Sequence, residues 1–220
     1  MTRIDLHTHS IASPDGRISE KQYTEAIDSG KLDVIAITDH NRIDYAVMMR
    51  KKHGDKIIVG EEIMTSEGEI IGLYLTKKVE PGLSLAETII AIRSQGGITY
   101  LPHPFETVRH GIMHSSLENL ENQIDIVETY NGRTLQNKGD YAKDWAGTND
   151  KPGAGSSDAH SKNGLSYTYT VIPKIPTKNT LLPLLRSGKI ISAKPPVKTY
   201  FDPKRNRIGK KLGIIKDNVA

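Results

Sequence analysis

Short β-branched segments alternate with helix-like segments along most of this chain. Residues 34–38 form a continuous apolar run, as expected of a strand buried on both faces, and a helical pattern over residues 43–53 follows. Earlier in the chain, Ser19 and Gln22 form a capping box for a helix that ends near Gly30. This alternation predicts a parallel α/β fold, either an open sheet or a barrel.

The pattern predicts further elements in the same order. A turn over residues 66–68 joins two strands, and Ser84 caps a helix that ends at Gly96 and Gly97. The expected strands are residues 3–7, 34–38, 56–64, 69–76, 98–101, 124–130 and 151–157.

Length and composition narrow the class of protein. A chain of 220 residues fits one α/β domain with a substantial core, and its apolar runs are far shorter than the roughly 20 residues of a membrane span. The first residues carry an acid and a histidine where a secretory signal needs apolar residues, so we expect a cytoplasmic protein without a membrane partner. With no cysteine, any metal site must use His, Asp and Glu.

Histidines and carboxylates collect where the predicted strands end. His7 and His9 are two positions apart on an extended segment, so their rings point to the same face and can share a metal ion. Alone, such a pair is more often an ordinary surface or paired feature. Five of the eight histidines, however, lie at strand ends beside carboxylates: His7, His9, His40, His103 and His160. This distribution is typical of a barrel active site.

Five motifs occur in the order and approximate spacing found in one family. The sequence resembles the polymerase and histidinol phosphatase (PHP) family of metal-dependent phosphoesterases over about residues 3–172. The resemblance implies a distorted (β/α) barrel of about seven strands, with two or three divalent ions at the C-terminal ends of the strands. The motifs are Asp5-Leu-His-Thr-His-Ser10, Thr38-Asp-His40, Gly60-Glu-Glu62, Pro102-His-Pro104 and Ser157-Asp-Ala-His160.

The same resemblance implies a set of metal ligands. The first ion takes His7, His9, Glu62 and Asp158; Glu62 bridges to a second ion that His103 binds; Asp15, His40 and His160 hold a third. Many family members have a further histidine for the second ion, and the nearest candidate here is Glu69. The alternatives are that Asp15 is an ordinary turn acid and that Glu69 is an exposed hairpin acid.

Mixed imidazole and carboxylate ligands suit manganese, iron or zinc. Two such ions lower the pKa of a bridging water, which makes hydroxide available as a nucleophile. We therefore expect Glu62, the bridging ligand, to be essential for catalysis. Asp39 is expected either to fix the tautomer of an imidazole or to cap the next helix.

The candidate phosphate-binding residues are Arg109, His110 and Arg133, although either arginine can equally be a surface ion-pair residue. The leading hypothesis is hydrolysis of a phosphomonoester of a small metabolite or nucleotide. One alternative is an exonuclease or other phosphodiesterase acting on nucleic acid, which two Phe and one Trp disfavour because they offer few stacking platforms. The other is a metal-binding regulatory domain without activity. No sequence feature defines an oligomeric state.

Positive charge is concentrated near the C-terminus. From Arg186 onward there are ten Lys and Arg against two Asp, whereas the whole chain carries a net charge of +4. We expect a phosphoesterase domain over residues 1–194 and a basic extension over residues 195–220 that docks loosely or meets another subunit and is dispensable for the chemistry. The competing idea is that its basic residues draw a polyanionic substrate to the cleft: Lys204, Arg205, Arg207, Lys210 and Lys211.

Overall fold

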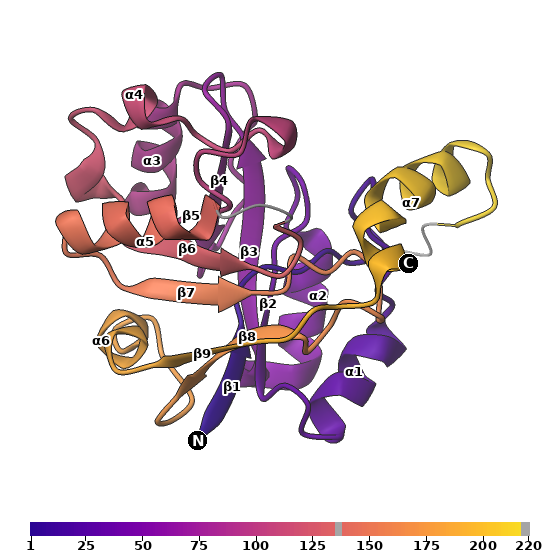
Figure 1. Ribbon diagram of the computed structural model, residues 1–220. Coiled ribbons are helices and arrows are strands. Elements are labelled where there is room, and N and C mark those ends of the chain that lie inside the picture. Colours follow the sequence, from indigo (N-terminus) through magenta and orange to yellow (C-terminus); the bar gives the residue numbers. More distant parts are fainter. Residues whose placement is uncertain (135–137, 217–220) are drawn as a thin grey trace.

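The computed structural model describes residues 1–134 and 138–216, and within them nine strands form one sheet. Along the sheet the strands follow the order β7-β6-β5-β4-β3-β2-β1-β8-β9 (Figure 1). Their bounds are β1 (Thr2–Asp5), β2 (Val34–Ile37), β3 (Ile57–Met64), β4 (Glu69–Leu73), β5 (Ile98–Leu101), β6 (Ile126–Asn131), β7 (Gly153–Ser156), β8 (Thr168–Ile172) and β9 (Lys189–Ser192).

The sheet curls until its two ends nearly meet. Thr170 of β8 bridges to β7, because its hydroxyl accepts from the backbone N–H of Gly155 at 2.9 Å and donates to the carbonyl of Gly155 at 3.1 Å. A Cβ on Gly155 would lie 2.4 Å from a methyl group of Ile190 on β9, so only glycine permits this close approach. The result is a nearly closed barrel, and the predicted barrel class is confirmed.

Alternate residues of the strands serve two separate apolar layers. In β2, Val34 and Ala36 belong to an apolar cluster to which most strands of the barrel contribute side chains. Ile35 and Ile37 instead pack with side chains of the surrounding helices. The two-residue period of an extended chain produces this division. It also explains why the predicted strands consist of continuous apolar runs.

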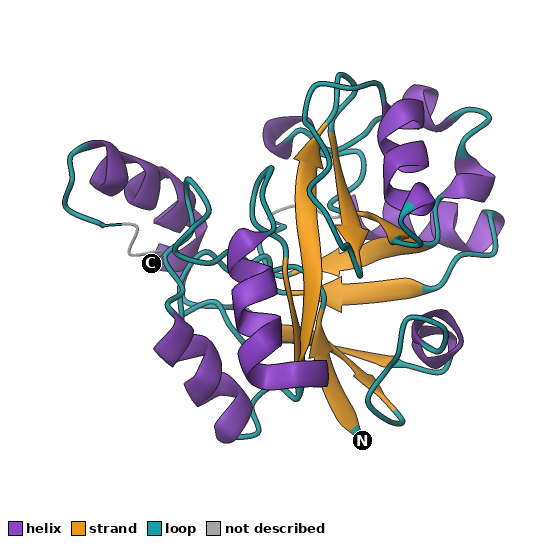
Figure 2. Cartoon of the chain, turned by 180° about the vertical axis from the view of Figure 1, so that it is seen from behind, coloured by secondary structure: helices purple, strands orange, loops and turns teal. Residues whose placement is uncertain are grey.

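Helices cover the outside of the barrel, as Figure 2 shows from behind. The capping box expected at Ser19 and the helix cap expected at Ser84 are present at the starts of two of them, and Ser84 also forms a capping box with Glu87. Bounds are α1 (Glu20–Asp28), α2 (Asp44–His53), α3 (Leu85–Ser94), α4 (His114–Leu117), α5 (Lys138–Thr148), α6 (Leu181–Arg186) and α7 (Asp202–Lys211), with 3₁₀ turns at Gly54–Lys56, Thr107–Arg109, Glu121–Gln123 and Val197–Phe201. None of the helices within residues 1–134 and 138–216 has the length and apolar content needed to cross a membrane.

Two features of the sheet differ from the sequence-based expectation. The structure has nine strands rather than about seven, since β8 and β9 were not anticipated. Both lie late in the chain, and β9 begins with the exposed Lys189, so its apolar pattern is short and weak. The sheet is also mixed rather than parallel, because β4 runs antiparallel to β3 and β5, and β8 runs antiparallel to β1 and β9.

The basic C-terminal segment does not dock loosely, contrary to expectation. Helix α7 lies on the side of the barrel toward which β6 and β7 point (Figure 1), and it buries Asp202, Asn206 and Gly209. Its polar side chains contact two loops that follow β1 and β7.

Candidate metal centre

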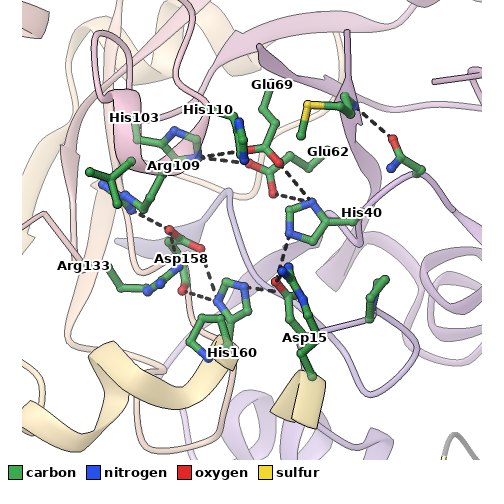
Figure 3. Close-up of a pocket in the computed structure, with 16 residues that line it drawn as sticks. Asp15, His40, Glu62, Glu69, His103, Arg109, His110, Arg133, Asp158 and His160 are labelled. Carbon is green, nitrogen blue, oxygen red and sulfur yellow. Dashed lines mark hydrogen bonds and ion pairs between the residues drawn. The ribbon is translucent and has the colours of Figure 1, made fainter. Parts of the chain in front are cut away.

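All nine ligands expected from the sequence lie together at one end of the barrel, where Figure 3 shows most of them around one cavity. His7, His9 and Asp15 follow β1, and Asp158 and His160 follow β7. The others are His40 after β2, Glu62 on β3, Glu69 at the start of β4 and His103 after β5. These residues form four overlapping groups in which the potential ligand atoms lie within 4.8 Å of one another.

The first group surrounds the two histidines of the His-x-His motif. The Nε2 atoms of His7 and His9 are 3.1 Å apart, and each lies 3.3 Å from the Oε2 atom of Glu62. The Oδ1 atom of Asp158 is 3.6 Å from His7 and 3.4 Å from His9. The prediction that the two rings face the same site is confirmed by this geometry.

Glu62 also reaches a second group of side chains. Its Oε1 atom is 3.1 Å from Nε2 of His103, and its Oε2 atom is 3.3 Å from Nδ1 of His40. Glu69 lies on the same side, 3.4 Å from His40 and 3.8 Å from His103. Glu69 is 5% exposed, so its interpretation as an exposed hairpin acid is wrong.

The third group centres on Asp15. Its carboxylate oxygens lie 3.4 Å from Nε2 of His40 and 3.5 Å from Nε2 of His160. His9 stacks on His160 with ring centroids 4.1 Å apart, which links this group to the first. Asp15 is buried in this cluster and is therefore not an ordinary turn acid.

The cluster shifts the pKa values of its members in opposite directions. Burial raises the pKa of Glu69 to about 7, and the neighbouring charge of Glu62 adds to this effect. Burial and His9 lower the pKa of His160 to about 4, so this imidazole is neutral and able to coordinate a metal at neutral pH. Burial opposes ionisation of Glu62, yet His7 and His40 outweigh it and hold the Glu62 pKa well below its usual range.

These residues fit divalent ions. Nδ1 of His7 lies 3.1 Å from Glu128, and this contact leaves the Nε2 lone pair directed at the Nε2 atom of His9. Two converging imidazole nitrogens beside buried carboxylates are satisfied by a shared cation, and the nitrogen and oxygen donors suit a first-row transition metal.

Two buried carboxylates that orient the ligands were missed by the sequence analysis. Glu128 on β6 contacts the His7 ring and accepts a hydrogen bond from the backbone N–H of His103 at 2.7 Å. Asp5 accepts hydrogen bonds from the backbone N–H of His7 at 3.3 Å and from the Ser157 hydroxyl at 2.5 Å. The signals available in the sequence were that Asp5 opens the first motif at the end of β1 and that Glu128 directly follows the apolar residues Ile126 and Val127.

Asp39 occupies neither of the roles expected for it. Its two carboxylate oxygens accept hydrogen bonds from the backbone N–H of Ser10 at 2.6 Å and the Ser10 hydroxyl at 2.5 Å. Helix α2 is capped by Ile43 without a side-chain hydrogen bond. Asp39 therefore holds the loop that follows His9 rather than an imidazole or a helix end.

The three expected phosphate-binding residues all line the cavity, whose volume is about 460 Å³. Arg109 and Arg133 both contact the Oδ2 atom of Asp158, at 2.7 and 3.1 Å. Arg109 is further held by Glu106, Asn131 and Thr134. By contrast, the buried Nε of Arg133 has no hydrogen-bond partner among the described residues. Arg207 of α7 also lines the cavity.

A barrel with buried imidazoles and carboxylates at its strand ends defines the class of metal-dependent hydrolases with this architecture. Within that class, the chain belongs to the PHP family. The PHP domain model matches residues 5–145, more than half of the chain, and the PHP-associated domain model matches residues 139–190.

Two proteins of Methanocaldococcus jannaschii are similar in sequence. The uncharacterized protein MJ1587 is 36% identical over 119 residues, which are 48% of this chain and 70% of that protein. The uncharacterized protein MJ0417 is 35% identical over 163 residues, 72% of this chain and 65% of that protein.

Solved structures share the fold at lower identity. A two-domain protein from Bacteroides vulgatus, containing a predicted PHP-like metal-dependent phosphoesterase, matches with a TM-score of 0.70 and 19% identity. That match covers 87% of this chain and 64% of the Bacteroides chain. PsfC from Pseudomonas syringae matches with a TM-score of 0.67 and 16% identity, over 96% of this chain and 99% of PsfC.

Proposed function

We propose that this protein hydrolyses a phosphomonoester of a small metabolite or nucleotide with the help of two or three divalent ions. The observation that carries the proposal is the composition of one cavity. Metal-ligand candidates from all the groups above line it together with Arg109, His110 and Arg133. A cavity with this lining matches the needs of a phosphate, which binds between cations.

The side chains in and beside the cavity have distinct parts in this reaction. His7, His9, Glu62 and their neighbours hold the ions, which when bound supply Lewis acidity and lower the pKa of water. Arg133 binds and orients the phosphate, since it lines the cavity, its Nη1 lies 3.1 Å from the candidate ligand Asp158, and its Nε lacks a partner among the described residues. Arg109 keeps Asp158 in place through several simultaneous contacts.

Manganese or iron suits this donor set, and zinc remains compatible with it. Glu69 supplies an oxygen where many family members have a nitrogen, so the second ion has a harder set of ligands. The cavity volume of about 460 Å³ accommodates a small molecule such as a phosphomonoester.

The test is a substrate screen with purified protein supplied separately with Mn²⁺, Fe²⁺ or Zn²⁺. Sugar phosphates, nucleotides, histidinol phosphate and short oligonucleotides are compared by release of inorganic phosphate and by gel analysis. We expect phosphate release from at least one phosphomonoester, and none after chelation. Cleavage of oligonucleotides alone would favour the phosphodiesterase alternative, and metal binding without any hydrolysis would favour a regulatory domain.

A further inference from the structure

Helix α7 reaches two of the candidate metal ligands from the far end of the chain. The side chain of Asn206 is fully buried, and its Nδ2 donates hydrogen bonds to the carbonyl oxygen of Asp15 at 2.7 Å and to that of His160 at 2.9 Å. One carboxamide therefore ties together the backbones of two ligands that follow different strands. In Figure 3 the yellow ribbon of the C-terminal segment lies beside both residues.

Other side chains of α7 contact the same loops. Lys210 donates to the carbonyl oxygen of Ser13 at 2.5 Å and to that of Ile11. Arg207 lies 3.2 Å from the Oδ2 atom of Asp15, and Asp202 accepts a hydrogen bond from the Ser161 hydroxyl. The helix is thus joined to the loop that carries Asp15 and to the loop that carries His160.

Within the described residues, the two loops contain no helix or strand, and the bridges nearest to these ligands join Ser10 to Ile18 and Thr8 to Ala159. Residues 11–17 form turns, in which Gly16 donates to the carbonyl of Ser13 at 3.3 Å and Arg17 donates to the carbonyl of His160 at 3.0 Å. A metal site needs its ligands held to within about 0.5 Å, and such precision depends on surrounding hydrogen bonds. The bonds from Asn206 add to the Arg17–His160 bond and restrain the backbones of both ligands.

We propose that α7 completes the third metal site and that Asn206 is its positioning residue. The proposal rests on the proposed function in that Asp15 and His160 are taken as metal ligands. It makes the basic C-terminal segment part of the metal centre rather than a dispensable extension. Asn206 touches neither ion nor substrate; it acts through Asp15 and His160.

The test measures metal binding by chelator-stripped protein, which does not depend on activity. Wild-type protein and an Asn206→Leu variant are titrated with Mn²⁺ by calorimetry, and their ion content is checked by elemental analysis. Leucine has a similar volume but cannot donate a hydrogen bond. We expect one Mn²⁺ per chain to be lost or to bind 10- to 100-fold more weakly, while the other ions bind as in wild type.

A neighbouring position on the same helix supplies the control. Arg205 is exposed and does not line the cavity, so Arg205→Ala should bind Mn²⁺ as wild type does. The variant Asp15→Asn should lose the same ion, and adding Asn206→Leu to it should cause little further loss, because both changes act on one site.

A second variant keeps the proposal testable if Asn206→Leu does not fold by circular dichroism. Lys210→Met keeps the length of the aliphatic chain but removes the ammonium group that donates to Ser13 and Ile11, and we expect it to weaken binding of the same ion. Unchanged Mn²⁺ number and affinity in the folded variants would overturn the proposal and leave the phosphoesterase function intact. Normal Mn²⁺ binding by wild type without hydrolysis of any phosphomonoester would instead overturn the function and leave the role of α7 in place.

Discussion

Nδ1 of His7 lies 3.1 Å from the Oε1 atom of Glu128, a residue 121 positions later in the chain. Glu128 also accepts hydrogen bonds from the backbone N–H of His103 at 2.7 Å and from the Tyr100 hydroxyl at 3.0 Å. One buried carboxylate therefore orients ligands from two of the metal groups. Burial raises the pKa of Glu128, but the nearby His7 outweighs burial and keeps the net pKa below its usual range.

Replacing this carboxylate should weaken metal binding without unfolding the protein. In Glu128→Gln the amide group must face one of several donors that the carboxylate accepts, so the His7 ring and the His103 backbone lose part of their restraint. We expect Mn²⁺ affinity to fall about 10- to 100-fold, measured by calorimetric titration. The exposed Glu118 serves as a matched control, and Glu118→Gln should bind as wild type does. Equal affinity in both variants would contradict the role of Glu128.

Purified protein prepared without chelator should carry two or three divalent ions per chain. The nine clustered ligands are enough for that number, and the groups share Glu62 and His9. Elemental analysis measures the content directly. Added metal should also raise the free energy of unfolding, by about 2.7 kcal/mol at a free concentration 100 times the dissociation constant. Less than one transition-metal ion per chain would refute the site.

Glu62→Gln should abolish turnover while the fold survives. The change removes the charge next to His7, His40 and His103 but leaves the side-chain volume almost unchanged. We expect kcat to fall at least about 100-fold, since a ligand shared between metal groups is lost. Glu25→Gln on the surface of α1 is the control, and circular dichroism checks the fold. Activity near the wild-type level in Glu62→Gln would remove this residue from the centre.

Substitution of Arg133 should mainly affect substrate binding, whereas substitution of Arg109 should mainly affect stability. Arg133→Met should raise KM about 10-fold or more with little change in the melting temperature, because it removes a charged partner of the phosphate. Arg109→Met should instead lower the free energy of unfolding by about 3 kcal/mol, because it removes a guanidinium that bonds Glu106, Asn131, Thr134 and Asp158 at once, whereas in Arg133→Met the Asp158 carboxylate keeps its contact with Arg109. Steady-state kinetics and thermal unfolding separate the two effects. Identical behaviour of the two variants would contradict this division.

The buried side chain of Glu61 should make the stability of the fold depend on pH, separately from metal binding. It points away from the centre, accepts a hydrogen bond from the Val79 backbone at 2.8 Å, and burial raises its pKa to about 7. The folded chain therefore holds this proton more tightly than the unfolded chain does, so the contribution to stability falls as pH rises from about 4.5 to about 7.

The change Glu61→Gln removes this dependence. Relative to wild type, the variant should gain up to about 3 kcal/mol between pH 5 and pH 8. Thermal unfolding of chelator-treated protein at both pH values measures the difference, in which the contributions of other groups cancel. A constant difference between the two proteins across this range would show that the Glu61 pKa is not raised.

Seven of the nine candidate ligands could be identified from the sequence because they lie within short ordered motifs near strand ends, whereas Asp15 and Glu69 lie outside these motifs. His7 and His9, for example, are two residues apart, and an extended chain necessarily directs both to one face. The supporting residues could not be found in this way. Glu128 is recognisable only once the strand that carries it is paired beside β5, and Asn206 lies on a helix whose own sequence is merely basic and polar.

The sequence by itself determined the alternation of strands and helices and the capped helix starts at Ser19 and Ser84, because these depend on local periodicity and spacing. The metal-ligand candidates came from the resemblance of its ordered motifs to the PHP family. Only the tertiary structure decided that β8 and β9 complete the barrel and that Glu62 contacts the histidine cluster while Glu61 bonds the backbone of Val79. It also decided that α7 contacts the backbones of Asp15 and His160. These features arise from contacts between residues far apart in the chain, and local sequence patterns do not specify such contacts.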